Sequence, residues 1–134
     1  MALMKTPLGS YQFRVEDNVV YQTFRGMFSG HTAATYLSET KKMINQFDGK
    51  PFSMLIDISD MLGLTPEGYE MIDKFNHWLN SQNLVAKAIV VSNDVIGKIV
   101  SERVPELKKQ NVRYFHDLHD AIEWVKNTQT NNSL

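Results

Sequence analysis

The sequence predicts an α/β fold with a mostly parallel, mixed sheet of five strands, in the order β-β-α-β-α-β-α-β-α. First, apolar and polar residues alternate near the start of the chain, which is typical of a strand hairpin. Second, the apolar runs at residues 52–58 and 84–91 are too short for helices. Third, apolar residues repeat at helical spacing in the segments between and after these runs. This alternation indicates parallel strands joined by right-handed crossovers.

The first two strands are expected to form an antiparallel hairpin. Tyr11, Phe13 and Val15 alternate with polar residues, as in a strand that buries one face. Turn-forming residues follow at 16–18, because Asn and Asp tolerate a left-handed backbone. A second strand over about residues 19–24 completes the hairpin.

Gly26 and Gly30 interrupt the chain before a first helix, which the spacing predicts from Thr32. The apolar stripe of this helix runs to Phe47, and Gly49 suits the left-handed residue that follows a helix.

The next unit is a buried strand at 52–58, a loop at 59–64 and a helix. Thr65 can cap this helix, Pro66 fits its first turn, and Glu67 favours its positive end.

The remaining elements repeat this pattern. Residues 92–94 cap a helix after the strand at 84–91, and Pro105 ends that helix and starts a further turn through Lys109. A last short strand covers 112–115. Asp117 caps a final helix whose buried face is Leu118, Ala121, Ile122 and Val125.

Composition limits the classes of function. The chain has 134 residues, so we expect a single domain over 1–134, with its core at about 11–127 and a polar, fraying tail at 128–134. A net charge of -1 argues against nucleic-acid binding. The lack of cysteine excludes thiolate catalysis, disulfides, zinc ribbons and iron–sulfur sites. No secretory signal and no run of about 20 apolar residues is present, so we expect a cytoplasmic protein.

The segment 51–72 (PFSMLIDISDMLGLTPEGYEMI) resembles the SpoIIAA-like group, which includes STAS domains and the CRAL-TRIO fold. STAS proteins, the anti-sigma-factor antagonists, carry a similar strand that ends in Asp and a helix that opens with Asp-Ser-Ser/Thr-Gly. Asp57 and Gly68 match these positions. The resemblance extends from about Tyr11 to Lys126 and implies the STAS-like fold.

One departure concerns the phosphorylation switch of STAS proteins. Pro66 stands where their phosphorylated serine would be, and proline cannot accept phosphate. Glu67 is then either a permanent imitation of that phosphate or an ordinary first-turn stabiliser. The sequence therefore gives no support for a phospho-switch.

Residues 26–28, 51–57 and 121–124 are similar to a branch of small stand-alone bacterial SpoIIAA-like proteins. This resemblance implies a non-enzymatic domain that forms a homodimer and binds a small apolar or lipid-like ligand.

Catalysis and metal binding are not expected. Asp57 and Asp60 flank the loop at a strand end, but the sequence does not show that they converge for acid–base work. His116 and His119 have a spacing near that of metal ligands, yet one ends a strand and the other begins a helix. No nucleophile motif or phosphate-binding loop is present. We predict no enzyme, no cofactor and no metal; a small enzyme using Asp57 or the late histidines is the third alternative.

The ligand is expected at the apolar loop before the Thr65 helix and along that helix. Apolar residues in a loop indicate a pocket or an interface, with core packing as the alternative. The predicted ligand-binding residues are Met61, Leu62, Leu64, Met71, Phe75 and Trp78, and the predicted partner-binding junction is Asp57, Thr65, Glu67 and Gly68.

Two further segments are candidates for membrane or interface contact. The segment 95–110 mixes apolar residues with lysine and arginine, as an amphipathic helix on a lipid surface does, although a core-packing helix looks the same. The candidate residues are Met27, Phe28, Ile96 and Val100.

The leading hypothesis is a non-catalytic, cytoplasmic, homodimeric binding module for an apolar or lipid-like ligand, with peripheral membrane contact. The alternative is a STAS-type protein-interaction regulator without a phosphoserine switch.

Overall fold

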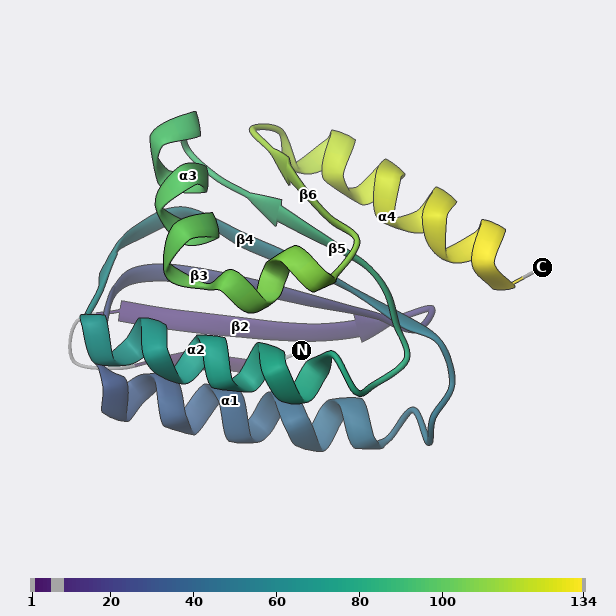
Figure 1. The fold of residues 1–134 in the computed structure, drawn as a ribbon, viewed down its shortest axis with the longest axis horizontal. Coiled ribbons are helices and arrows are strands. Elements are labelled where there is room, and N and C mark those ends of the chain that lie inside the picture. The colour runs from purple at the N-terminus through teal and green to yellow at the C-terminus, as the bar shows by residue number, and fades with distance from the viewer. Residues whose placement is uncertain (1, 6–8, 134) are drawn as a thin grey trace.

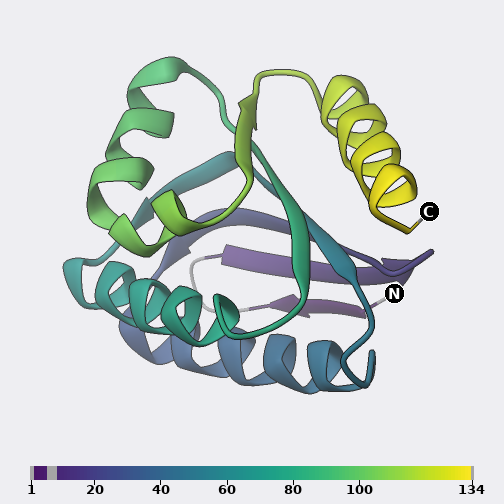
Figure 2. The ribbon, with the colours of Figure 1, turned by 45° about the vertical axis from the view of Figure 1, so that its right-hand side comes forward.

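The protein is built on a single twisted sheet with helices on both faces (Figure 1, Figure 2). The computed structural model describes residues 2–5 and 9–133. The six strands lie in chain order and are β1 (Ala2–Lys5), β2 (Gly9–Glu16), β3 (Val19–Phe28), β4 (Phe52–Leu64), β5 (Leu84–Val90) and β6 (Val112–Phe115). The helices are α1 (Gly30–Asn45), α2 (Pro66–Leu79), α3 (Asp94–Arg103), the 3₁₀ helix η1 (Pro105–Lys109) and α4 (Leu118–Ser133).

The sheet topology confirms the predicted fold class. β2 and β3 form the expected antiparallel hairpin, and β3, β4, β5 and β6 are parallel. Asp17 and Asn18 form the hairpin turn with φ of 52° and 60°, the left-handed values that these residues tolerate. The sheet also has a strand that the sequence analysis did not predict: β1, which pairs antiparallel with β2.

The helices divide unequally between the two faces. α1, α2, α3 and η1 cover one face, and α4 alone covers the other (Figure 2). Because successive strand residues point to opposite faces, the central strands supply both layers, which explains their continuous apolar runs. The core under α4 contains Val19, Tyr21, Leu55, Ala88, Val90, Ala121 and Val125.

The predicted caps of three helices are confirmed. Thr65 Oγ1 accepts a hydrogen bond from Gly68 N at 3.1 Å, and Asn93 Oδ1 accepts one from Ile96 N at 3.0 Å. Asp117 Oδ1 accepts from His119 N at 2.7 Å. Each cap satisfies a backbone N–H that has no partner inside the helix.

The chain around the first helix differs from the prediction. β3 continues through Gly26, which has φ of 84°, and ends at Phe28. Ser29 caps α1, so this helix begins at Gly30 and not at Thr32. The predicted left-handed residue is present, since Gly49 has φ of 81°.

The predicted loop at 59–64 is wrong, because β4 continues through these residues. β3 pairs with β4 up to Phe28 opposite Leu64, with register shifts between Thr23 and Arg25 and between Gly26 and Met27. The polar residues in this segment suggested a loop, but the irregular pairing accommodates them within the strand. Met61, Leu62 and Leu64 are therefore strand residues.

The predicted fraying of 128–134 is also wrong for the part that the structure describes. α4 extends to Ser133, and the buried Gln129 fastens it to the start of β4. Gln129 Oε1 accepts a hydrogen bond from Ser53 Oγ, and its Nε2 donates to Pro51 O at 3.2 Å.

We predict that Gln129→Ala lowers the free energy of unfolding by about 1–2 kcal/mol, because it leaves the buried Ser53 hydroxyl without this acceptor. Urea denaturation measures the change. Asn127→Ala, at an exposed position of the same helix, is the matched control and should change stability by less than about 0.5 kcal/mol. Equal effects of the two substitutions would show that the Gln129 contact contributes nothing.

Candidate functional site

A cavity of about 80 Å³ lies between the sheet and the helices α1, α2 and α3. Its wall is almost entirely apolar, and strand residues from β3, β4 and β5 form one side. The lining residues are Gln22, Phe24, Tyr36, Leu37, Thr40, Met54, Ile56, Ile58, Met61, Leu64, Tyr69, Ile72, Phe75, Asn76, Lys87, Ile89, Val100, Val104 and Leu107.

Lys87 is the lysine in this mainly apolar wall. It lies in the middle of β5 and is 1% exposed, between the fully buried Ala86 and Ala88. Its Nζ donates a hydrogen bond to Asn76 Oδ1 on α2. The sequence analysis did not single out Lys87, although a lysine inside the apolar run LVAKAIVV was a visible signal.

Two contacts hold the Asn76 side chain in place. Its Nδ2 donates to Ile72 O at 2.8 Å, and its Oδ1 also accepts from Gln110 Nε2 at 3.0 Å. With Lys87 and Gln110 as donors, both lone pairs of this oxygen are engaged. The amide orientation is therefore fixed, and it presents an acceptor to the lysine.

The electrostatics of the cavity disfavour a charged lysine. No Asp or Glu is among the residues that line it. Burial lowers the pKa of Lys87 from its ordinary 10.5 to about 7, because the ammonium loses its hydration. Burial also raises the pKa of Tyr36, so that this phenol stays neutral. Lys87 is thus the one lysine or arginine side chain lining a cavity that otherwise holds neutral groups.

A second polar pair faces the same cavity from β3 and α1. Gln22 Nε2 donates to Thr40 Oγ1 at 2.8 Å, and Thr40 Oγ1 donates to Tyr36 O at 2.7 Å. Both side chains are buried. The cavity therefore has two polar pairs in its lining, one from β3 and α1 and one from β5 and α2, and its other walls are mainly apolar.

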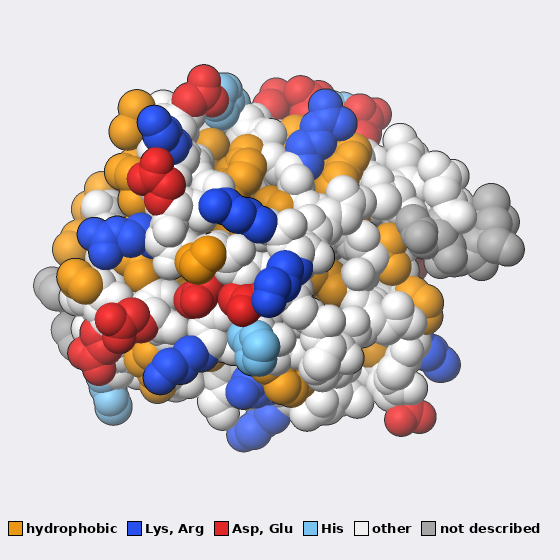
Figure 3. All heavy atoms as spheres, viewed as in Figure 1, with side chains coloured by type: hydrophobic (Ala, Val, Ile, Leu, Met, Phe, Trp, Pro, Cys, Tyr) orange, Lys and Arg blue, Asp and Glu red, His pale blue; other side chains and the backbone are white. Residues whose placement is uncertain are grey.

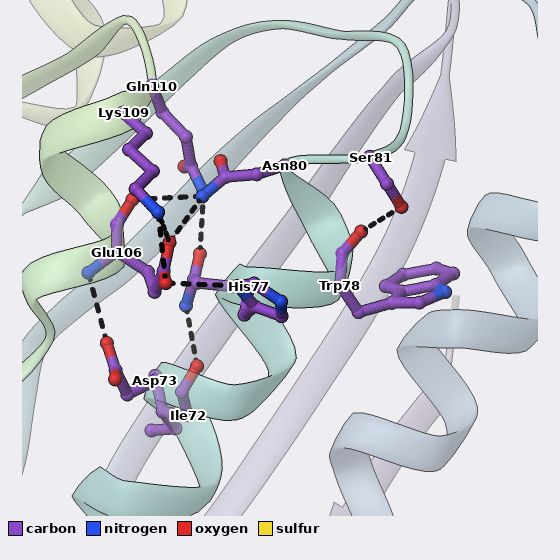
Figure 4. Close-up of polar contacts among 10 residues, drawn as sticks. Ile72, Asp73, His77, Trp78, Asn80, Ser81, Glu106, Lys109 and Gln110 are labelled. Carbon is purple, nitrogen blue, oxygen red and sulfur yellow. Dashed lines mark hydrogen bonds and ion pairs between the residues drawn. The ribbon is translucent and has the colours of Figure 1, made fainter.

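The 3₁₀ helix η1, which brings Leu107 to the cavity, is held against α2 by the carboxylate of Glu106 (Figure 4). This carboxylate contacts Lys109 Nζ at 3.1 Å, His77 Nδ1 at 3.0 Å and Asn80 Nδ2 at 3.0 Å. Asp73 accepts a hydrogen bond from the backbone N–H of Glu106 at 3.0 Å. The bond from Lys109, with smaller contributions from His77 and Asn80, lowers the pKa of Glu106.

The predicted ligand-binding residues divide into two groups. Met61, Leu64 and Phe75 line the cavity. Leu62 is not among the residues that line it and is 80% exposed. Met71 lines a shallow hollow between α1 and α2, and Trp78 packs on Phe75 with Lys41 Nζ 5.1 Å from its ring centre.

The partner-binding junction lies where α1 and α2 begin side by side. The shallow hollow there is lined by Ser29, Gly30, His31, Ala34, Thr65, Glu67 and Met71. Glu67 lies against Gly30, since a Cβ on Gly30 would be 2.7 Å from Glu67 Cδ. Its carboxylate is therefore near the positive ends of two helices. Gly68 lies in close contact with Leu64, since a Cβ there would be 2.5 Å from Leu64 Cδ1 and the leucine side chain would have to shift.

The carboxylates of Asp57 and Asp60 do not converge. Asp57 Oδ1 accepts from Ser59 N at 3.0 Å and from Ser59 Oγ at 2.6 Å. Asp60 is exposed and lies 3.5 Å from Arg25 Nε. Asp57 therefore stabilises the local backbone at Ser59, and Asp60 lies at the surface.

The late histidines also point to separate partners. His116 Nε2 contacts Asp94 Oδ1 at 2.7 Å, and His119 Nε2 lies 3.7 Å from Glu123. Within residues 2–5 and 9–133, no group of three or more His, Asp or Glu side chains could hold a metal ion.

Two of the four candidate membrane or interface residues are not at the surface. Phe28 and Val100 are 2% and 8% exposed because both belong to the core cluster under α1 and α3. Ile96 is half-buried against the same cluster, and Met27 is 42% exposed. Figure 3 shows hydrophobic side chains along the edge of the molecule where β3 and β4 end. None of the helices that the structure describes is long and apolar enough to cross a membrane.

The strand order and the β4–α2 unit agree with the resemblance to the SpoIIAA-like group in the sequence. The model of the SpoIIAA-like family matches residues 19–126. The chain belongs to the SpoIIAA-like family. Most of the sheet and all of the cavity lining lie within the matched range. A comparison with curated proteins found no match.

Solved structures share this SpoIIAA-like fold at low identity. An uncharacterised DUF3478-family protein from Shewanella loihica PV-4 is 15% identical with a TM-score of 0.64, covering 91% of this chain and 98% of the other. An anti-sigma factor antagonist from Mycobacterium paratuberculosis is 15% identical with a TM-score of 0.62, and the match covers 92% of this chain and 99% of the antagonist. The murine anion transporter Slc26a9 is 16% identical with a TM-score of 0.63, covering 85% of this chain and 18% of the transporter.

We predict that Lys87→Met stabilises the protein, and that it does so most at low pH. The unfolded chain binds more protons than the folded one between about pH 7 and pH 10.5, so the unfolding free energy of the wild type rises with pH in this window. Between pH 6 and pH 9, the free energy of unfolding of the wild type should rise by about 2–3 kcal/mol relative to that of the variant. Urea denaturation at the two pH values provides the measurement.

The control for this substitution is Lys98→Met, on the exposed side of α3. Its stability should follow the pH dependence of the wild type. If the stability of Lys87→Met also followed that dependence, Lys87 would not have a lowered pKa.

Proposed function

We propose that this SpoIIAA-like domain is a non-catalytic, STAS-type regulator that binds a protein partner without a phosphoserine switch. The shared fold with an anti-sigma factor antagonist supports this assignment. The observation that carries it is the chemistry of the junction at the start of α2, where Pro66 replaces a residue that could be phosphorylated and Glu67 supplies a permanent negative charge.

The binding surface that we propose, the junction surface, consists of Met27, Leu62 and the residues 65–67. Leu62 is 80% exposed and Met27 is 42% exposed, and Met27 lies against Gly63, the residue after Leu62, since a Cβ on Gly63 would be 3.2 Å from Met27 Sδ. An apolar centre beside a carboxylate suits a partner with an apolar contact and a basic side chain next to it.

The lipid-like ligand of the sequence analysis has no support in the comparisons, and the cavity is too small for it. At about 80 Å³ the cavity is smaller than the engineered cavity of about 150 Å³ that holds one benzene molecule. A long acyl chain would need a large rearrangement of the core. Peripheral membrane contact and a homodimer remain proposals, which liposome co-sedimentation and sedimentation velocity would test.

We predict that substitutions in the junction surface remove partner binding. A photo-crosslinking residue placed at position 62 in the source cells should capture one predominant protein. Glu67→Lys should reduce the crosslinked yield about tenfold, because it places a positive charge against a basic contact, worth roughly 1.4 kcal/mol. Mass spectrometry of the crosslinked product measures the yield.

The matched control is the same crosslinker at Val15, which is 47% exposed at the opposite end of the β2–β3 hairpin. It should capture little of that protein. A product of equal yield from both positions, or one unaffected by Glu67→Lys, would count against the proposal.

A further inference from the structure

We propose that the cavity under α1, α2 and α3 is a binding site for a short aliphatic monocarboxylate, with the side-chain amine of Lys87 as its anchor. This inference concerns a different part of the molecule from the junction surface. It depends on the position of Lys87, on the hydrogen bonds of Asn76, and on the size and lining of the cavity.

The amine of Lys87 has capacity for another partner. An ammonium carries three N–H groups, and Asn76 Oδ1 is its one hydrogen-bond acceptor among the residues that the structure describes. Because this oxygen already accepts from Gln110 as well, it cannot satisfy a second N–H of the lysine. An anionic ligand in the cavity would supply the missing acceptors.

The lining defines the charge of the ligand. Among the described residues, no carboxylate side chain lines the cavity to neutralise Lys87, and no second lysine or arginine lines it. One positive charge in a site of low polarity favours a single negative charge. Gln22 is a further donor in the lining, because its Nε2 has one N–H beyond its bond to Thr40.

The walls define the rest of the ligand. Ile56, Ile58, Ile72 and Ile89 surround the cavity with aliphatic surface, which excludes a strongly hydrated anion such as phosphate. A cavity of about 80 Å³ has the volume of roughly three water molecules, so a ligand with more than a few non-hydrogen atoms requires the flexible Met61 side chain to move. Propionate and butyrate have an aliphatic chain and a single negative charge, and they are short enough to be accommodated by such a movement.

The entry that fits this proposal is at the carboxyl end of β4. Met61 and Leu64 line the cavity there, at the edge of the sheet where ligands of open α/β folds gather. Met61 has an unbranched, flexible side chain that can move aside.

The test is titration calorimetry with sodium butyrate at pH 6.5, compared with the neutral butyramide. Butyrate should bind with 1:1 stoichiometry, and Lys87→Met should weaken its binding at least about 30-fold, as the loss of a charged hydrogen bond predicts. Lys98→Met should bind as the wild type does. Absence of butyrate binding up to 10 mM ligand, unchanged binding by Lys87→Met, or equal binding of butyramide would overturn the proposal.

A second measurement needs no variant. In protein labelled with ¹³C at lysine Cε, butyrate should raise the titration midpoint of the Lys87 signal by at least one pH unit, because a bound carboxylate favours the ammonium. Sodium chloride at the same ionic strength should not. If butyraldehyde with borohydride modified Lys87 while butyrate left its titration unchanged, the site would bind carbonyl compounds, and the proposal would be overturned.

Discussion

The parallel pairing of β3 with β4 is the contact on which the rest of the structure depends. It runs from Val19 opposite Ser53 to Phe28 opposite Leu64 and joins the antiparallel hairpin to the parallel half of the sheet. Because strand residues alternate, this pairing presents one apolar set to α4 and another to α1 and α2. The same pairing carries β4 beyond its apolar run and so decides where α2 begins.

Sequence patterns predicted the elements whose signals are local. The caps at Thr65, Asn93 and Asp117 need only one side chain and a backbone N–H three residues or fewer away, and all three are present. The continuation of β4 through 59–64 was missed because it depends on β3, which is distant in the sequence and pairs there with shifted register. The anchoring of Gln129 was missed for the same reason, since its partners Ser53 and Pro51 are more than 70 residues away.

The candidate site shows a similar division. Sequence reasoning placed Met61, Leu64 and Phe75 near an apolar space, and they line the cavity. It could not place Lys87, because a lysine in a strand run is buried only if a helix covers that face and supplies an acceptor. Asn76 on α2 is that acceptor, and Gln110 after η1 fixes it. A lysine so placed lowers stability at neutral pH, so its presence favours a role in binding over a role in packing.

The cavity and the junction surface are connected by Leu64. Its side chain lines the cavity, and it packs so closely on the first turn of α2 that a Cβ on Gly68 would be 2.5 Å from its Cδ1. Leu64 is also the residue before Thr65, whose hydroxyl caps α2. A ligand that displaces Leu64 on entry would therefore disturb the cap and the position of Glu67. If a ligand in the cavity changes the affinity of the junction surface for its partner by some factor, the partner must change the affinity of the cavity for that ligand by the same factor, because linkage between two binding sites is reciprocal.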